Sequence, residues 1–231
     1  MPRMPWTITR EMFLSSDEVG RLLLHLDRQV RRVSGEAHLS VQFDRLIILT
    51  LLYSGIRTSE LCGLRLGDID KQPALHIRLR SRIVRTVYIP ESVHDALTDY
   101  IQTIRPHWLP DGTRRDDRTK PIFHHERGRP FERTGLYRRV VRILTEAGLG
   151  RRASVQLLRH TYGYLAYRNT GGNLLFVQRQ LGHAHPMITS VYSQFVEESY
   201  GDLADLVARP STPVKSLKKA KGVSHVRTRS V

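Results

Sequence analysis

The chain has 231 residues, of which 37 are Lys or Arg and 22 are Asp or Glu, so its formal net charge is +15. This balance favours a polyanionic partner, with nucleic acid as the first candidate, although another kind of basic protein, such as a ribosome-associated one, has a similar composition. The sequence contains no apolar run long enough for a membrane span and no apolar signal core near its start. Its single cysteine, Cys62, cannot form an internal disulfide, which fits a reducing cytoplasm.

Two helices are expected in the first quarter of the chain. Ser15 and Glu18 have the spacing of a capping box, so a helix is predicted to begin there. A second helix is predicted over residues 40–54. Its centre, residues 46–52, is apolar on all sides, which indicates that it is buried in the middle of a domain. Gly55 is expected to follow its C-cap in a left-handed conformation.

Arg57 follows this helix end directly, where its backbone position is well fixed. Thr58 or Ser59 is expected to cap the next short helix, with Glu60 in its first turn. Glu60 is close enough along the chain to orient Arg57 or a neighbouring histidine. An ordinary salt bridge at a helix end is the other interpretation of this pair.

A β-hairpin is predicted next. Residues 74–80 and 84–89 each alternate apolar with polar side chains, as expected for two antiparallel strands joined by a turn at residues 81–83. Arg80 and Arg82 lie at or beside this turn. Contacts of these arginines to a phosphate backbone, without a chemical role, are one interpretation.

The middle of the chain is expected to contain a helix over residues 90–104, a surface loop over residues 106–120 and a short strand over residues 121–123. No metal site is expected at His124 and His125. Adjacent side chains point apart in an extended chain, and no Cys or acidic residue follows at ligand spacing.

A basic helix is predicted over residues 134–147. Arg138, Arg139 and Arg142 lie on it beside a series of apolar residues. Basic side chains along one helix face suit contacts to the DNA backbone or a groove. A solvated arginine face fits the same composition.

The last third of the chain carries Arg159, His183 and Tyr192. A guanidinium group matches phosphate oxygens with two hydrogen bonds, and an imidazole can donate or accept a proton near neutral pH. A phenol can attack phosphorus where cationic neighbours favour its oxyanion. These residue types at these separations indicate phosphate chemistry.

The expected helices position these groups. Arg159 lies on a helix face that can turn toward a site, and the adjacent His160 is expected to be structural. Gly182 is expected to stop the following helix, so that His183 projects from a helix end. Tyr192 is expected to lie within the helix after that.

Two sequence boxes together resemble a known family. L-R-H at residues 158–160, L-G-H at 181–183 and Y-x-x-F at 192–195 are similar to the C-terminal signature of the tyrosine recombinases, the phage integrase family. G-I-R-T-S-E-L at residues 55–61 resembles the family's first arginine box. The resemblance covers about residues 13–205. It implies a mainly α catalytic domain of the DNA breaking-rejoining type, with a small antiparallel β-hairpin or sheet at one edge.

The resemblance also implies roles for individual residues. Tyr192 would be the nucleophile that forms a 3′-phosphotyrosyl bond with DNA, without ATP, a metal ion or another cofactor. Glu60 would orient catalytic residues without contacting the phosphate itself. The hairpin contains no lysine, so Arg80, or alternatively Arg82, stands where the family has one, and Gln156 stands where the family usually has histidine. The implied catalytic set is Arg57, Arg80, Gln156, Arg159, His183 and Tyr192.

The chain is expected to comprise an arm at residues 1–12, a catalytic domain at residues 13–208 and a disordered tail at residues 209–231. The tail holds seven Lys or Arg and no acidic residue, which favours sequence-independent attraction to phosphate. A helical segment at residues 196–208 would dock on a neighbouring protomer or pack internally. The small N-terminal part resembles short, single-domain family members.

The implied function is site-specific recombination or integration of double-stranded DNA in the cytoplasm by a homo-oligomer, a tetramer on DNA. Two alternatives remain open. One is a DNA-binding relative with impaired catalysis, and the other is a nicking and resealing enzyme similar to type IB topoisomerases.

Overall fold

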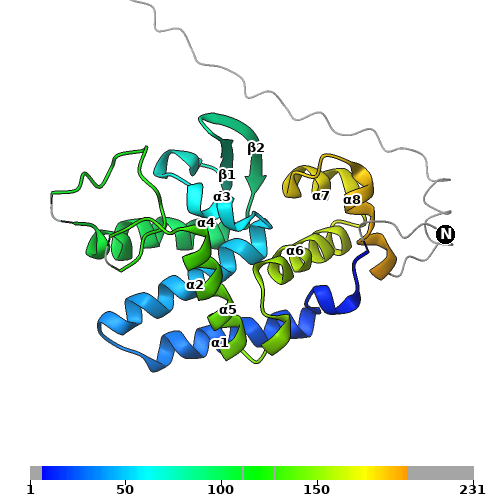
Figure 1. Cartoon of the computed structure of the whole chain (residues 1–231), viewed down its shortest axis with the longest axis horizontal. Helices are drawn as coiled ribbons and strands as arrows, with labels where there is room; N and C mark the ends of the chain where they lie inside the picture. The colour runs from blue at the N-terminus through cyan, green and yellow to red at the C-terminus, as the bar shows by residue number, and fades with distance from the viewer. Residues whose placement is uncertain (1–6, 111, 127, 197–231) are drawn as a thin grey trace, which may run out of the picture. The chain divides into compact units, whose positions relative to one another are not determined.

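A computed structural model of the chain describes residues 7–110, 112–126 and 128–196. This part is mainly helical, with one two-stranded antiparallel sheet (Figure 1), which confirms the predicted fold class. The expectations for residues 197–208 and for the basic tail lie outside the described residues. The α-helices and strands are α1 (Ser16–Arg32), α2 (Glu36–Ser54), α3 (Thr58–Gly63), β1 (Ala74–Leu79), β2 (Arg82–Tyr88), α4 (Glu91–Asp99), α5 (Arg133–Glu146), α6 (Val155–Asn169), α7 (Leu174–Leu181) and α8 (Pro186–Ser190).

Helix α1 begins at the predicted capping box. The Ser15 hydroxyl accepts a hydrogen bond from the Glu18 backbone N–H at 3.2 Å, and the Glu18 carboxylate accepts one from the Ser15 N–H at 2.8 Å. Val19, Leu22 and Leu26 are buried on one face. This face packs against α2, so the local start signal and the apolar spacing together place the helix.

Helix α2 is the centre of the fold. It contacts α1, α4, α5 and α6, and all of residues 46–52 are buried, as their apolar pattern predicted. The helix begins at Glu36, earlier than expected, because Gly35 takes a positive φ of 68° and lets the chain turn directly into it. Gly55 ends the helix in the left-handed conformation, with φ 63°. A Cβ at Gly55 would lie 2.4 Å from the Tyr162 ring, so this close approach also requires glycine.

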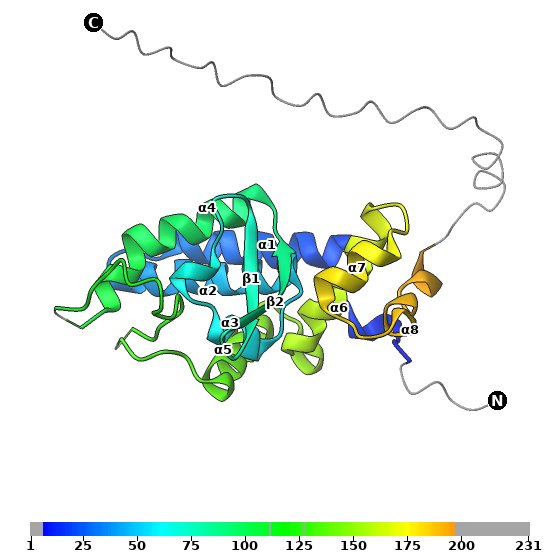
Figure 2. The ribbon, with the colours of Figure 1, turned by 90° about the horizontal axis from the view of Figure 1, so that it is seen from above.

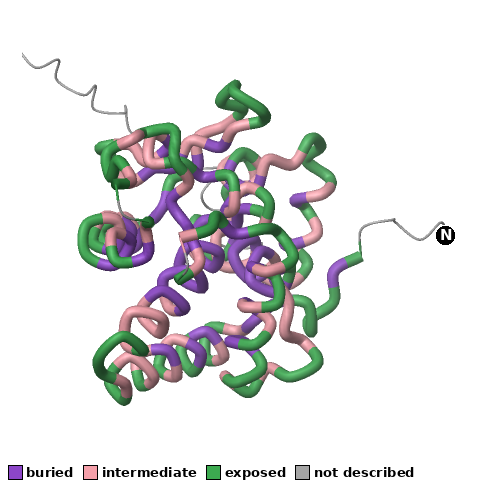
Figure 3. Tube along the Cα trace, turned by 60° about the vertical axis from the view of Figure 1, so that its left-hand side comes forward, coloured by how far each residue is buried: buried purple, intermediate pink, exposed green. Residues whose placement is uncertain are grey.

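The hairpin has a shorter turn than expected. Leu79 pairs with Arg82, so only Arg80 and Ser81 lie in the turn, and residues 82 and 83 belong to β2. Arg80 has a φ of +57°, a conformation that glycine adopts more easily. Residues 79–84 are exposed (Figure 3). Seen from above, the hairpin lies between α4 and α7, and β2 contacts α7 (Figure 2).

The segment after α4 continues the predicted helix with a change of winding. Tyr100–Ile104 forms a π-helical turn and Arg105–Trp108 a 3₁₀ turn, where Pro106 cannot supply a backbone donor. The short strand predicted at residues 121–123 was wrong. Pro121 forms only an isolated bridge with Arg65, so no ladder develops. The remaining 3₁₀ turns are Arg10–Met12, Leu66–Asp68, Gly150–Arg152 and Ser193–Phe195.

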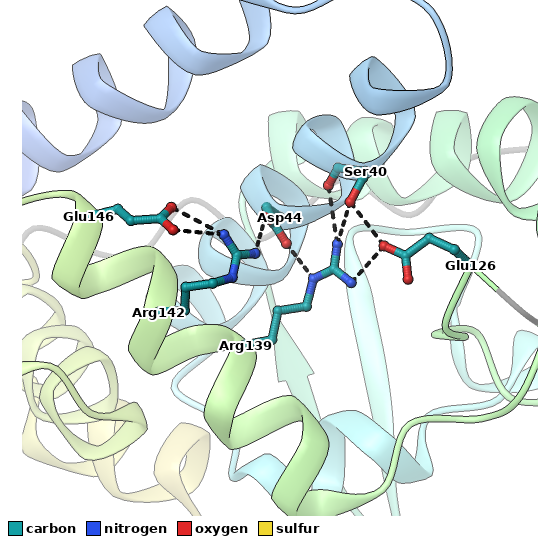
Figure 4. Close-up of polar contacts among 6 residues, drawn as sticks. All are labelled: Ser40, Asp44, Glu126, Arg139, Arg142 and Glu146. Carbon is teal, nitrogen blue, oxygen red and sulfur yellow. Dashed lines mark hydrogen bonds and ion pairs between the residues drawn. The ribbon is translucent and has the colours of Figure 1, made fainter.

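Ion pairs join α5 to α2. The Arg139 guanidinium donates to Asp44 and, at 2.8 Å, to Glu126, and Arg142 donates to Asp44 at 2.7 Å. The Arg139 and Asp44 side chains are each only 12% exposed. These arginines are therefore occupied within the chain. Figure 4 shows the whole network, formed by Ser40, Asp44, Glu126, Arg139, Arg142 and Glu146.

The last described segment differs from the prediction at one point. Helix α8 ends at Ser190, so Tyr192 lies in a turn after it and not within a helix. The helix begins with Pro186 and is only five residues long, too short to be stable without its tertiary contacts. In the described part of the chain, no helix is long and apolar enough to cross a membrane.

Candidate active site

Arg159 occupies the middle of the site and is buried, with 7% of its surface exposed. Helix α6, which carries it, begins where the Ser154 hydroxyl accepts from the Leu157 N–H at 3.0 Å. One terminal nitrogen of Arg159 donates to the Gly55 carbonyl at 2.5 Å, and the other donates to the Leu181 carbonyl at 2.7 Å. The arginine thereby joins the C-terminal ends of α2 and α7. Its burial, and then the charge of Arg57, lower its pKa to about 10.

Glu60 gathers two arginines. Its carboxylate accepts two hydrogen bonds from the Arg85 guanidinium, at 2.7 and 2.8 Å, and one from an Arg57 terminal nitrogen at 3.2 Å. Burial raises the pKa of Glu60, but the hydrogen bonds from Arg85 and from the Arg57 backbone outweigh it, so the pKa lies below its usual value. The predicted contact between Glu60 and Arg57 is present.

The start of α3 differs in detail from the prediction. Arg57, and not Thr58 or Ser59, is its N-cap residue, and the Arg57 N–H donates to Glu60 at 2.7 Å. The Arg57 side chain is 49% exposed. It can therefore reach a ligand while its backbone stays fixed at the end of the buried helix α2.

His183 follows Gly182, which ends α7 in the left-handed conformation as predicted. The His183 Nδ1 atom lies 2.8 Å from the Thr189 hydroxyl. Burial lowers the pKa of His183 to about 4, and the charges of Arg159 and Arg57 add to this effect. The imidazole is therefore neutral near pH 7. A Cβ at Gly182 would lie 3.0 Å from the Arg85 guanidinium, so the absence of a side chain at residue 182 lets this guanidinium lie close to the end of α7.

Tyr192 is buried, with 1% of its surface exposed, and its burial raises the pKa of the phenol to about 12. The charge of Arg159 acts in the opposite direction on this phenol. The Tyr192 hydroxyl lies 3.1 Å from Nδ1 of His160. The sequence predicts a structural role for His160. Its contact with Tyr192 joins residues 32 apart in the chain, which no local pattern links.

Two hollows meet at Arg57. A groove of about 1010 Å³ is lined by Arg57, Glu60, Arg85 and His183, among others. A second hollow of about 590 Å³ is lined by Arg57, Gln156 and Arg159, among others. Arg85 also belongs to this site and was not among the site residues expected from the sequence. Its place in the hairpin could be read from the sequence, but its contact with Glu60, 25 residues earlier, could not.

The remaining candidates lie elsewhere. Arg80 and Arg82 are exposed at the end of the hairpin and line neither hollow. Of the helix α5 arginines, Arg138 is exposed, whereas Arg139 and Arg142 are paired with acidic side chains. DNA contacts of these five arginines stay predictions.

The similarity of the chain to known proteins agrees with this arrangement. Residues 12–198 match the phage integrase family. The chain belongs to this family, which confirms the resemblance seen in the two sequence boxes.

Particular relatives are tyrosine recombinases. The chain is 30% identical over 192 residues to tyrosine recombinase XerC of Halalkalibacterium halodurans, covering 83% of this chain and 60% of that protein. The XerA recombinase crystal structure is 25% identical with a TM-score of 0.61, covering 90% of this chain and 68% of that one. The XerH recombinase bound to its difH substrate is 22% identical with a TM-score of 0.65, covering 85% of this chain and 53% of that one. The chain thus spans about 60% of the XerC relative.

Proposed function

We propose that this protein is a site-specific DNA recombinase that cleaves and rejoins double-stranded DNA through a covalent bond to Tyr192. The observation that carries the proposal is the gathering of Arg57, Arg159 and His183 at adjoining hollows, with the Tyr192 phenol within the field of Arg159. Membership in the phage integrase family supports it. So do the relatives named as recombinases, one of which is described in pre- and post-cleavage complexes with DNA.

In the proposed reaction, the Tyr192 oxygen attacks a backbone phosphorus. The bond from phosphorus to the 5′-oxygen breaks, which leaves a 3′-phosphotyrosyl bond and a free 5′-hydroxyl. A hydroxyl from the same or a partner strand reverses the step. One ester is exchanged for another, so the energy of the bond is retained and no ATP is needed.

The arginines stabilise the charge that develops on the nonbridging oxygens. Arg159 is already fixed by its hydrogen bonds to Gly55 and Leu181, so little reorganisation is needed when the phosphate arrives. Arg57 is more exposed and can close on the phosphate from the solvent side. His183, neutral near pH 7, can donate a hydrogen bond to an oxygen of the phosphate.

Protonation of the leaving 5′-oxygen is assigned to Arg80, with Arg82 as the alternative; both lie at the exposed end of the hairpin and line neither hollow, so this role requires the hairpin end to reach the bound DNA. Guanidinium binds phosphate well but gives up a proton poorly, because its pKa lies above about 12. Gln156 can hydrogen-bond a phosphate oxygen but cannot exchange a proton. Cleavage is therefore expected to be slow. Arg80→Lys should raise the rate if the side chain still reaches the phosphate.

The finer assignments belong to the same proposal. Residues 13–208 form the catalytic domain, with an arm at 1–12 and a DNA-attracting tail at 209–231. Arg138, Arg139 and Arg142 contact the DNA backbone, the latter two after releasing their ion pairs. The protein acts as a homo-oligomer, a tetramer, on DNA in the cytoplasm.

The decisive experiment is a test for the covalent adduct. The full chain is incubated with nicked duplexes carrying candidate recombination sites, and SDS-stable protein–DNA adducts are measured. The unaltered protein should form the adduct, whereas Tyr192→Phe should bind the same DNA without forming it. An adduct of equal yield with Tyr192→Phe would disprove the nucleophile assignment.

A DNA-binding relative with impaired catalysis is the second candidate. It is favoured by the two departures from the family pattern, Arg80 and Gln156, and by the complete burial of the Tyr192 phenol. DNA binding by the unaltered protein without any adduct would support this candidate. A nicking and resealing enzyme would instead relax supercoiled DNA without joining two sites.

A further inference from the structure

The buried phenol of Tyr192 has a specific polar neighbour. Among the described residues, its hydroxyl makes one hydrogen bond to a side chain, with His160 Nδ1 at 3.1 Å. The two rings are tilted by 52°, with their centroids 6.3 Å apart. The contact joins α6 to the turn that follows α8. It therefore depends on tertiary packing and places an imidazole on the atom that would attack phosphorus.

The direction of this hydrogen bond follows from the charge states. Burial raises the pKa of Tyr192 to about 12, while burial and then the charge of Arg159 lower the pKa of His160 below its ordinary value. Both side chains are thus neutral near pH 7. A neutral phenol needs an acceptor for its O–H, and His160 Nδ1 supplies one when the ring proton is on Nε2.

Glycine at position 163 creates the space for this arrangement. Gly163 lies one turn after His160 on the same face of α6. A Cβ at Gly163 would lie 2.3 Å from Tyr192 Cζ and 2.6 Å from its hydroxyl oxygen. Any side chain there would displace the ring, so the absence of one lets the phenol reach His160.

We propose that His160 is the proton acceptor for Tyr192 during strand cleavage. As the Tyr192 oxygen forms its bond to phosphorus, its proton moves to His160 Nδ1. The electron pair of the breaking bond leaves with the 5′-oxygen, which takes a proton from Arg80, from Arg82 or from water. On rejoining, His160 returns the proton to Tyr192. This inference rests on the proposed function and adds a catalytic residue to it.

The alternatives around the phenol are less suitable. Gln156 is exposed, and an amide cannot take up a proton. His183 Nδ1 is already engaged by the Thr189 hydroxyl. Because the pKa of the phenol lies far above that of His160, free phenolate is scarcely populated. The proton must therefore leave while the bond to phosphorus forms, which is how a general base acts.

The charged and titratable groups whose fields act on this pair are known. Arg159, on the same helix, disfavours imidazolium and favours phenolate, and His183, after α7, feels the charge of His160. Burial and then the charge of Arg159 therefore lower the pKa of His160 and keep it unprotonated near pH 7. When a phosphate arrives, its negative charge offsets that of Arg159, and protonation of His160 becomes easier.

The test compares variants in single-turnover adduct formation on the nicked duplex, with the full chain. His160→Ala should slow adduct formation by about 10²–10⁴-fold, the usual contribution of a general base, with DNA binding unchanged. His160→Gln, which keeps a hydrogen-bond acceptor but not a base, should be as slow. His94→Ala, on α4, is the matched histidine control and should keep the rate. Thermal melting confirms that each variant is folded.

Added bases provide a readout that a structural role would not move. Imidazoles of increasing pKa should restore adduct formation by His160→Ala with a rate that rises with the pKa of the base. The unaltered protein should lose rate at low pH as His160 becomes protonated, and this fall should be absent from both variants. Rates equal to or above that of the unaltered protein, or rescue that is absent or independent of the pKa of the base, would overturn the assignment. If the unaltered protein itself forms no adduct, the proposed function fails instead.

Discussion

The described residues form two hydrophobic clusters that differ in composition. The larger one surrounds α2 and consists mostly of Leu, Ile and Val side chains. The smaller one is rich in tyrosine and comprises Ile8, Phe13, Tyr162, Tyr167, Val177, Leu181 and Tyr192. Polar atoms at the edge of the larger cluster form ion pairs, as between Asp44 and Arg139. In the smaller cluster three of the seven buried side chains are tyrosines; Tyr162 donates to Gln180 at 3.3 Å, and the Tyr192 hydroxyl lies 3.1 Å from His160 Nδ1.

The two clusters differ in what they hold in place: the larger one positions the backbone of the site, and the smaller one encloses the proposed nucleophile. Aliphatic packing around α2 fixes the backbone at Gly55 and Arg57, whereas the tyrosine cluster keeps the phenol of Tyr192, the proposed nucleophile, out of solvent. Arg159 connects the two, since it donates to Gly55 on one side and Leu181 on the other. With Tyr192 only 1% exposed, a phosphate can reach its oxygen only after the turn that carries it moves. We therefore expect the packing of the smaller cluster to loosen before that of the larger one.

The largest effect is expected from removing Arg159, which connects the two clusters. Arg159→Ala leaves the Gly55 and Leu181 carbonyls without their donors in a buried site. It should lower the free energy of unfolding by about 2–5 kcal/mol and abolish adduct formation. Urea unfolding measures the first effect. Arg138→Ala, at an exposed arginine, should change stability by less than about 0.5 kcal/mol. Equal unfolding midpoints for the two variants would contradict the bridging role.

Overpacking the smaller cluster should act on it directly. In Gly163→Ala, the new methyl group meets the Tyr192 ring at 2.3 Å, and we expect a loss of about 1–3 kcal/mol of unfolding free energy. Gly20→Ala is the matched control. Gly20 lies within α1 with open space around its Cβ position, and alanine there should stabilise the helix by up to about 1 kcal/mol. A Gly163→Ala variant as stable as the parent would mean that Tyr192 does not pack as described.

The ion pairs at the edge of the larger cluster offer a sharper comparison. Asp44→Asn weakens the links to Arg139 and Arg142 at a carboxylate that is 12% exposed, and should cost about 1–2 kcal/mol. Asp27→Asn removes a pair with Arg45 at a side chain that is 36% exposed, where about 0–1 kcal/mol is expected. Thermal melting of both variants tests this order. The reverse order would show that burial does not set the value of these pairs.

Acid should affect the site region through His183. Its pKa is lowered from 6.5 to about 4, so the unfolded chain binds a proton there before the folded chain does. This contribution to stability is complete above pH 6.5 and is lost as the pH falls toward 4. We expect about 1 kcal/mol from this half-buried group. His183→Gln should flatten the unfolding free energy between these pH values by that amount, and an unchanged slope would contradict the assignment.

Local signals in the sequence predicted much of the fold. The capping box at Ser15 and Glu18, the apolar centre of α2 and the glycine ends at Gly55 and Gly182 all appear as expected. Each depends on residues within about one helical turn, where spacing alone determines the contact. For the same reason, the predicted neighbourhood of Glu60 and Arg57, three residues apart, is present in the structure.

Contacts between distant residues could not be predicted in this way. The pairing of Glu60 with Arg85 depends on how the hairpin packs against α3, and the contact of His160 with Tyr192 depends on how α8 ends. The arginines of α5 show the same limit. Their spacing predicts a DNA-facing surface, which stays a prediction, but it gives no sign that Asp44, nearly a hundred residues earlier in the chain, pairs with Arg139.

The carboxylate of Glu60 has a consequence for the charge balance of the site. Arg57, Arg85 and Arg159 are three cations within one another's fields, and Glu60 neutralises one of them, which leaves a formal charge of +2. A phosphodiester carries a single negative charge, whereas the five-coordinate phosphorus formed when the deprotonated phenol adds carries two. In the proposed step the proton of the phenol passes to His160, so the total charge of site and DNA stays at +1. Any stabilisation of the five-coordinate species would therefore come from where the arginine charges lie, not from a change in net charge.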